Sequence, residues 1–174
     1  ALEARSRLAA RARDPLTIPA PTPDSLSLSD VVVARPFGDG ALPGHRFDPA
    51  LHPHTTLVFP TGSTVGLYAE AHHLRPGPDG LARYRVQVSL RPAPAPAAVR
   101  ALRWLGRTLR ILDSPTLPRI AWSATTADAP GAPAIIAIDL ALDAVPPGVH
   151  TLELAITDLI SRTQRTSTRP LRIR

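Results

Sequence analysis

Two histidines in the first third of the chain are spaced so that they could share a metal ion. His52 and His54 are two residues apart, and an extended strand places such side chains on one face. Asp48 and His45 lie nearby in the sequence and offer further ligand atoms. A structural metal site needs four ligands, and no second cluster in the sequence has ligand spacing. We therefore expect no metal and no cofactor.

The three residue types of a hydrolytic triad also occur, in Asp113, Ser114 and His150. Triads are defined by their geometry rather than by the presence of the three types. No strained nucleophile turn and no glycine-rich oxyanion turn surrounds Ser114. Gly62 and Gly66 form no phosphate-binding loop, because the G-x-x-x-x-G-K pattern is absent and the chain has no Lys. The sequence therefore predicts a protein that is not an enzyme.

The composition argues against several further functions. The chain has 174 residues, enough for one domain with a tail, and 44% of them are hydrophobic, enough for a core. It contains no Cys, so the sequence has no disulfide, thiolate metal site or thiol nucleophile. No run of about 18 apolar residues occurs, so we predict no membrane-spanning helix. An aromatic content of 4% argues against base-stacking nucleic-acid modules.

The formal net charge is +6, and the chain contains Arg but no Lys. A basic balance suits nucleic acid, anionic lipid or an acidic protein partner. The use of Arg in place of Lys is typical of a GC-rich coding sequence, which does not explain why Arg gathers at both ends of the chain. The Arg residues lack interleaved aromatics, and no nucleic-acid-binding motif occurs. We therefore expect a protein or lipid partner and no nucleic acid.

Residues 1–24 are predicted to form a basic arm. Residues 1–13 are rich in Ala and Arg and favour a short helix, which is marginal on its own. Residues 14–24 are rich in Pro, which predicts an extended, polyproline-like linker. Such an arm has no core of its own and is stabilised by lying on a partner. The predicted docking residues of the arm are Arg5, Arg7, Arg11, Arg13, Pro15, Pro19, Pro21 and Pro23.

Residues 25–174 have the pattern of an all-β domain, an Ig-like β-sandwich, because short apolar stretches alternate with Gly- and Pro-rich turns. Apolar and polar residues alternate in 64–74 and again in 83–90, after a turn, so this pair is predicted to form a β-hairpin. Residues 37–54, rich in Gly, Pro and His, are predicted to form a loop. We predict strands at 26–36, 55–59, 64–74, 83–90, 119–125, 134–142, 148–157 and 164–173.

Residues 98–112 depart from the strand pattern. Leucines recur there at helical period on one face and arginines on the opposite face, which predicts an amphipathic helix. Three interpretations stay open: the helix covers an open end of the sandwich, it lies on a membrane surface, or a strand runs here and the period is chance. The predicted docking residues of this segment are Arg103, Trp104, Arg107 and Arg110.

Several blocks of the sequence resemble the β-rich C-terminal domain of bacterial GWxTD-domain proteins. The first three are LSLSDVVVARPF at 26–37, LVFPTGSTVGLYAEAHHL at 57–74 and YRVQVSL at 84–90. The fourth runs from 146 to 174, where a Pro-Gly turn leads into alternating strands. The resemblance covers about residues 24–174, and it implies an exported β-sandwich protein without established catalysis.

Two details of the resemblance concern individual residues. In the family, one strand ends in the pattern Y-x-E-x-x-x-L, which Tyr68, Glu70 and Leu74 match here. The GWxTD motif itself is absent, and His150 stands where the family has an aromatic residue.

The predicted function follows from the arm, the basic segments and the resemblance. Free-standing domains of this kind are similar to the membrane-extrinsic subunits of bacterial double-ring photosystems, which hold a reaction centre within its light-harvesting ring. We therefore predict a non-catalytic, periplasmic structural subunit that docks on a membrane protein complex and contacts anionic lipid headgroups. The alternative is an extracytoplasmic carbohydrate- or peptide-binding module, with its ligand near Trp104, Trp122 or Tyr68.

Overall fold

The computed structural model describes residues 2–3, 8–9, 25–93, 117–127 and 132–174. Within these residues the protein is all-β, and its strands form one sheet of five, one of four and a separate two-stranded ladder. The predicted all-β sandwich is therefore confirmed at the level of two sheets, and the immunoglobulin-like topology stays a prediction. None of the described segments is a helix with the length and hydrophobicity needed to cross a membrane.

The five-stranded sheet is antiparallel except at one edge, where β5 runs parallel to β11. Every region predicted as a strand contains one. In sheet order the strands are β5 (Val58–Phe59), β11 (Gln164–Ile173), β10 (Gly148–Asp158), β7 (Leu81–Pro92) and β8 (Arg119–Ala127).

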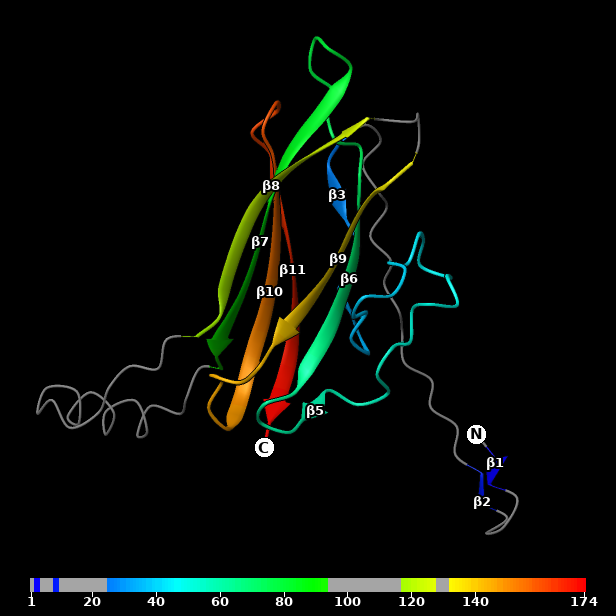
Figure 1. Cartoon of the computed structure of the whole chain (residues 1–174), viewed down its shortest axis with the longest axis vertical. Coiled ribbons are helices and arrows are strands. Elements are labelled where there is room, and N and C mark those ends of the chain that lie inside the picture. Colours follow the sequence, from blue (N-terminus) through cyan, green and yellow to red (C-terminus); the bar gives the residue numbers. More distant parts are fainter. Residues whose placement is uncertain (1, 4–7, 10–24, 94–116, 128–131) are drawn as a thin grey trace, which may run out of the picture.

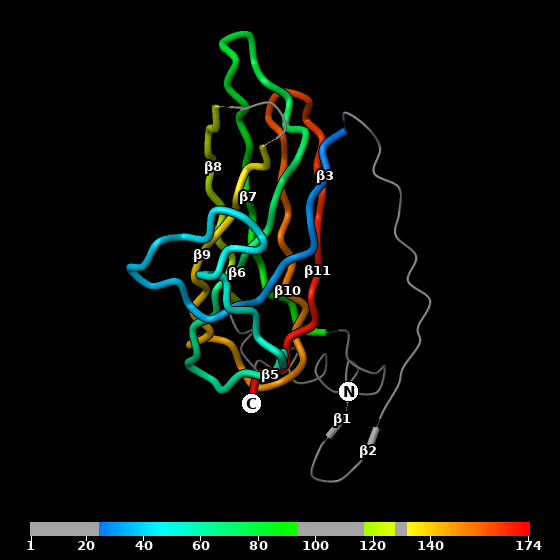
Figure 2. The backbone as a smooth tube through the Cα atoms, turned by 90° about the vertical axis from the view of Figure 1, so that its right-hand side faces the viewer, coloured from blue at the N-terminus to red at the C-terminus, as the bar shows by residue number. Residues whose placement is uncertain are grey.

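The four-stranded sheet is built around β6 (Thr64–His72). One edge of β6 pairs with β9 (Ala134–Ala141), and the other pairs with β3 (Ser27–Leu28) and β4 (Val32–Ala34) in turn. Figure 1 shows β6 and β9 in one layer and β7, β10 and β11 in the other. Figure 2, turned by a quarter, shows β3 beside β11, where the two layers meet at one side.

The core lies between the two sheets, because each long strand points one alternate set of apolar side chains inward. On β6 this set includes Val65 and Leu67, and on β7 it includes Val86 and Val88, all of them buried in one cluster. Full burial of each such side chain contributes about 1.5–3 kcal/mol. The alternation that identified these strands in the sequence is therefore the alternation that builds the core.

The predicted hairpin between 64–74 and 83–90 is wrong. β6 and β7 belong to different sheets, and the isolated bridge near their connection joins Pro76 to Ala82 of β7 and does not pair the two strands. The two strands each carry a full apolar face, and these faces are buried by packing against each other across the core rather than side by side. The connection at 73–80 is long enough to carry the chain from one layer to the other.

The described part of the arm is a short ladder. β1 (Leu2–Glu3) pairs antiparallel with β2 (Leu8–Ala9), so these four residues are extended where the sequence predicts a helix over 1–13. An isolated helix of this length is marginal in water, so little free energy opposes the extended pairing of these four residues. The rest of 1–24 lies outside the described residues, as does the predicted helix at 98–112.

Candidate functional site

The 37–54 loop covers the outer face of β6, on the side away from the five-stranded sheet (Figure 1). Leu51 of the loop packs with Ala34 and Tyr68 in a second, smaller apolar cluster. Two apolar side chains of the loop point to solvent instead, since Phe47 is 88% exposed and Leu42 is 58% exposed. They are the most exposed large hydrophobic residues in the described part of the chain.

Asp139 of β9 fixes the first end of this loop. Its carboxylate accepts hydrogen bonds from the backbone N–H groups of Phe37 and Gly38, each at 2.9 Å. Gly66 of β6 pairs with Asp139 in register and lies directly under the chain there. A Cβ on Gly66 would stand 2.5 Å from the Arg35 carbonyl oxygen and 3.1 Å from the Phe37 ring. This end of the loop therefore requires an acid on β9 and a glycine on β6.

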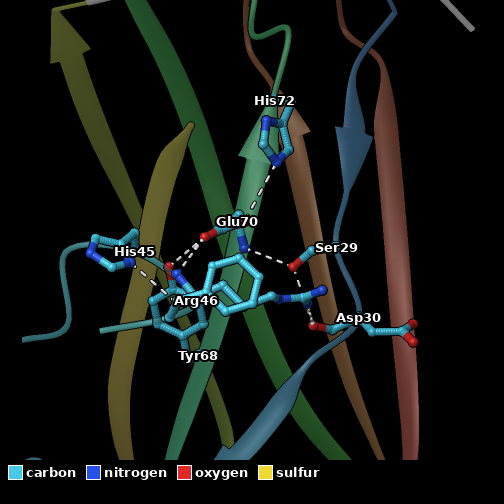
Figure 3. Close-up of polar contacts among 8 residues, drawn as sticks. Ser29, Asp30, His45, Arg46, Tyr68, Glu70 and His72 are labelled. Carbon is cyan, nitrogen blue, oxygen red and sulfur yellow. Dashed lines mark hydrogen bonds and ion pairs between the residues drawn. The ribbon is translucent and has the colours of Figure 1, made fainter. Parts of the chain in front are cut away.

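Glu70 of β6 fixes the middle of the loop (Figure 3). Its Oε1 accepts hydrogen bonds from the Tyr68 hydroxyl at 2.6 Å and from the Arg46 backbone N–H at 2.9 Å. The Glu70 backbone N–H donates to the Ser29 hydroxyl oxygen at 2.9 Å. The Arg46 guanidinium donates through Nη2 to the Asp30 carbonyl oxygen at 3.0 Å. Glu70 thus joins the loop to β6 through its carboxylate and holds the segment that follows β3 through its backbone N–H.

Tyr68 is fully buried under the loop, and its hydroxyl acts only as a donor to Glu70. Burial raises the pKa of Tyr68 far above its ordinary value, and the hydrogen bond to Glu70 raises it further. The phenol therefore keeps its proton at neutral pH. The tyrosine and the acid of the Y-x-E pattern serve to hold the loop.

Asp48 fixes the turn that carries the exposed Phe47. Its two carboxylate oxygens accept hydrogen bonds from the backbone N–H groups of Gly44 and Ala50, each at 2.8 Å. These two bonds hold the pKa of Asp48 below its ordinary value. The Phe47 N–H donates to His45 Nδ1 at 3.2 Å. The backbone on both sides of Phe47 is thus tied into the loop, and the ring is presented on a preformed support.

The candidate metal ligands have other roles. Asp48 and His45 hold the turn around Phe47, and the His54 ring packs edge-on against Phe59 with a centroid separation of 5.0 Å. The His52 carbonyl oxygen accepts a hydrogen bond from the Arg35 N–H. No group of three or more His, Asp or Glu residues that could hold a metal ion occurs among the residues that the structure describes.

The candidate triad is represented in the described residues by His150 alone. This histidine is buried at one end of the core, with Nε2 2.8 Å from the Pro146 carbonyl oxygen. Ser114 and Asp113 lie outside the described residues.

Of the aromatic residues considered for ligand binding, Tyr68 is buried and Trp122 is half-buried on β8. A fully buried tyrosine offers no surface to a ligand, so Tyr68 does not serve the predicted binding module. Trp104 lies outside the described residues, together with all the predicted docking residues: Arg5, Arg7, Arg11, Arg13, Pro15, Pro19, Pro21, Pro23, Arg103, Arg107 and Arg110. Docking by these residues stays a prediction.

The sequence reasoning missed Phe47 and Leu42. Both lie in a segment recognised only as a loop, and a single apolar residue in a loop carries no periodicity. The available signal was an aromatic residue next to Arg46 in a stretch otherwise rich in Gly, Pro and His. Chemically, the loop can present an apolar anchor to a partner. No protein-family model matches the sequence, and no curated protein sequence matches it.

Proposed function

We propose that this protein is a non-catalytic structural subunit that docks on a larger membrane-associated assembly. The observation that carries the proposal is the 37–54 loop, which holds an 88% exposed Phe47 on a fixed backbone. An aromatic side chain left in water gives up the stabilisation that burial would bring, whereas aromatic anchors dominate the energetics of protein interfaces.

The fixed backbone is what makes this residue suited to docking. Binding costs free energy when a loop must be ordered on contact, and a preformed loop avoids most of that cost. Asp139, Glu70 and Asp48 hold the loop before any partner arrives. The basic arm at 1–24 and the arginines of 98–112 supply further contacts in the proposal, to acidic protein surfaces or anionic lipid headgroups.

The finer form of the proposal concerns the assembly. On the resemblance described above, the partner is a photosynthetic reaction centre within its light-harvesting ring, and the subunit lies on the periplasmic side of the membrane. This form predicts that the material co-purifying with the chain from native membranes carries light-absorbing pigments. A pigment-free membrane complex would refute the finer form and leave the docking proposal standing.

The docking proposal is tested by replacing the anchor. In solubilised native membranes the tagged wild-type chain should elute with a large complex, and Phe47→Ser should shift it to the free chain. Leu159→Ser is the matched control, because Leu159 is a 38% exposed apolar residue outside the loop. Exposed substitutions of this kind change stability by about 0.5 kcal/mol or less, so both variants should stay folded. A Phe47→Ser chain that still elutes with the complex would refute the role of the loop.

The arm is tested separately by deleting residues 1–24. The proposal predicts that the truncated chain keeps the thermal transition of the sandwich and is lost from the complex. An assembly that retains the truncated chain in full would contradict docking by the arm. The competing binding-module function predicts instead saturable heat with glycans or peptides in calorimetry.

A further inference from the structure

The strand β8 lies at one edge of the five-stranded sheet. β7 is its only partner within the part of the chain that the structure describes, and the pairing runs from Leu81 with Ala127 to Ser89 with Arg119. In an antiparallel strand alternate N–H and C=O groups point to each side. The outer side of β8 therefore presents a row of backbone donors and acceptors along its nine residues.

The opposite edge of the same sheet is covered by contacts of a kind that β8 lacks among the described residues. There, the Val31 N–H donates to the Ser167 hydroxyl oxygen at 3.2 Å, and the Arg169 side chain donates to the Val31 carbonyl oxygen at 3.1 Å. β5 adds a short parallel pairing to the end of β11. Proteins commonly protect edges with charged side chains, Pro or covering segments. β8, with the sequence RIAWSATTA, has no Pro and carries one charge, at its first residue.

The side chains of β8 also leave apolar surface open. Ile120, Trp122 and Ala124 point to the core, yet all three are only half-buried. The residues between them, Ala121 and Ser123, are small, exposed and uncharged. An added strand would pair with the outward N–H and C=O groups of β8 and would also cover the exposed part of the Trp122 ring.

We propose that β8 pairs antiparallel with β8 of a second copy of this chain, centred on Ser123, to form a two-fold dimer with a continuous sheet. A two-fold axis is the commonest symmetry of soluble oligomers and requires a surface that is complementary to itself. The proposal rests on β8 alone and is independent of the 37–54 loop.

The sequence of β8 selects this register. Centring on Ser123 pairs all nine residues and places Trp122 opposite Ala124 of the second copy, so that a large side chain packs against a small one. Centring one residue earlier would place the two Trp122 rings directly opposite each other. Pairings that shift one copy by a single residue would turn its core-facing side chains to solvent.

The charges on β8 agree with the same register. Arg119 lies opposite Ala127, so the two arginines of the dimer stand at opposite ends of the paired strands, about 27 Å apart. The remaining contacts of β8 carry no charge. Each copy has a net charge of +6, and the resulting long-range repulsion is screened by salt. Dimerisation should therefore strengthen as salt rises, whereas binding to an anionic surface would weaken.

The absence of Cys from the chain allows a direct test of the register. Residues directly opposite each other in an antiparallel pair have Cα atoms about 4.5–5.5 Å apart, within the span of a disulfide. Ser123→Cys in the full chain should therefore give a covalent dimer on mild oxidation. Ala121→Cys alone should not, because residue 121 of the two copies would stand about 14 Å apart. A mixture of two single-variant chains, one with Ala121→Cys and one with Thr125→Cys, should cross-link. Thr168→Cys, at an exposed position on β11, is the control and should not cross-link.

A second measurement uses charge in place of cross-linking. In a chain with both Ala121→Asp and Thr125→Asp, residue 121 of each copy would lie opposite residue 125 of the other, so two pairs of carboxylates would repel each other. The dimer dissociation constant, measured by sedimentation velocity, should rise about tenfold or more. Ala121→Asp combined with Thr125→Arg sets opposite charges together and should restore dimerisation. Thr168→Asp should have no effect. A wild-type chain that stays monomeric up to its solubility limit overturns the proposal, as does a dimer in which Ser123→Cys fails to cross-link.

Discussion

The Tyr68 hydroxyl and the Glu70 carboxylate, two residues apart on β6, are joined by a 2.6 Å hydrogen bond under the 37–54 loop. Neighbouring outward positions of a strand normally face solvent, but here the loop buries the tyrosine completely. The same carboxylate oxygen accepts the Arg46 N–H, so one buried contact supports the segment that carries Phe47.

The first prediction concerns this contact. Tyr68→Phe keeps the ring and removes the donor, leaving the half-buried Glu70 carboxylate with less hydrogen bonding. The free energy of unfolding in urea should fall by about 1–3 kcal/mol. Tyr84→Phe is the matched control, since the Tyr84 hydroxyl makes no hydrogen bond among the described residues, and its effect should be smaller. Equal effects from the two variants would contradict the role of the Tyr68–Glu70 bond.

The second prediction concerns the close approach at Gly66. Gly66→Ala places a methyl group 2.5 Å from the Arg35 carbonyl oxygen, which is backbone and cannot swing aside. Overpacking of this kind costs about 1–3 kcal/mol, and it should appear as a lower midpoint in thermal unfolding. Gly44→Ala is the control, because its added methyl meets only an Asp48 side-chain oxygen at 3.6 Å. A Gly66→Ala chain as stable as wild type would show that the loop entrance is loosely packed.

The third prediction concerns acid stability. Asp158 is buried, which raises its pKa, but its carboxylate accepts hydrogen bonds from the Arg75 N–H, the Ser161 hydroxyl and the N–H groups of Ile160 and Ser161. Together these bonds outweigh burial and hold the pKa of Asp158 below its ordinary value of 3.8. A carboxyl with a lowered pKa in the folded state stabilises fully above the unfolded value and loses its contribution as pH falls through the folded one.

The contribution of Asp158 to stability should therefore be constant through neutral pH and decline below about pH 4, where the unfolded chain takes up the proton first. Asp158→Asn should lower the free energy of unfolding at neutral pH. It should also reduce the decline of that free energy below about pH 4, the acid limb of the profile, as measured by urea unfolding at a series of pH values. The exposed Asp39→Asn is the control and should leave the limb in place. An acid limb of the same depth in Asp158→Asn and in wild type would contradict this assignment.

Much of the fold follows from the sequence because its strands carry their own signal. The alternation of Val65, Leu67 and Ala69 marked β6, and the same period marked β7 and β10. The alternation says which face is buried, but it does not say which strand lies alongside. That is why the β6–β7 hairpin was predicted wrongly: both strands satisfy their apolar faces equally well by packing across the core.

The candidate site was harder to predict for the opposite reason. The 37–54 loop is held by single contacts between residues distant in sequence, such as Asp139 with Phe37 and Glu70 with Arg46. No local pattern encodes such contacts, so neither the fixed loop nor the exposure of Phe47 followed from the residue types. The resemblance did single out Tyr68 and Glu70, and the structure gives those two residues a supporting role.

The most direct test of the docking account asks whether the 37–54 loop is covered in the assembly while Phe47 stays in place. Leu42→Cys introduces a single thiol beside the anchor, at a position that is 58% exposed in the free chain. Its alkylation rate by a maleimide should fall at least about tenfold when the chain is bound in native membranes, since covered thiols react slowly. Leu159→Cys, outside the loop, should keep its rate. Equal alkylation of Leu42→Cys in the free and the assembled chain would contradict docking through this loop.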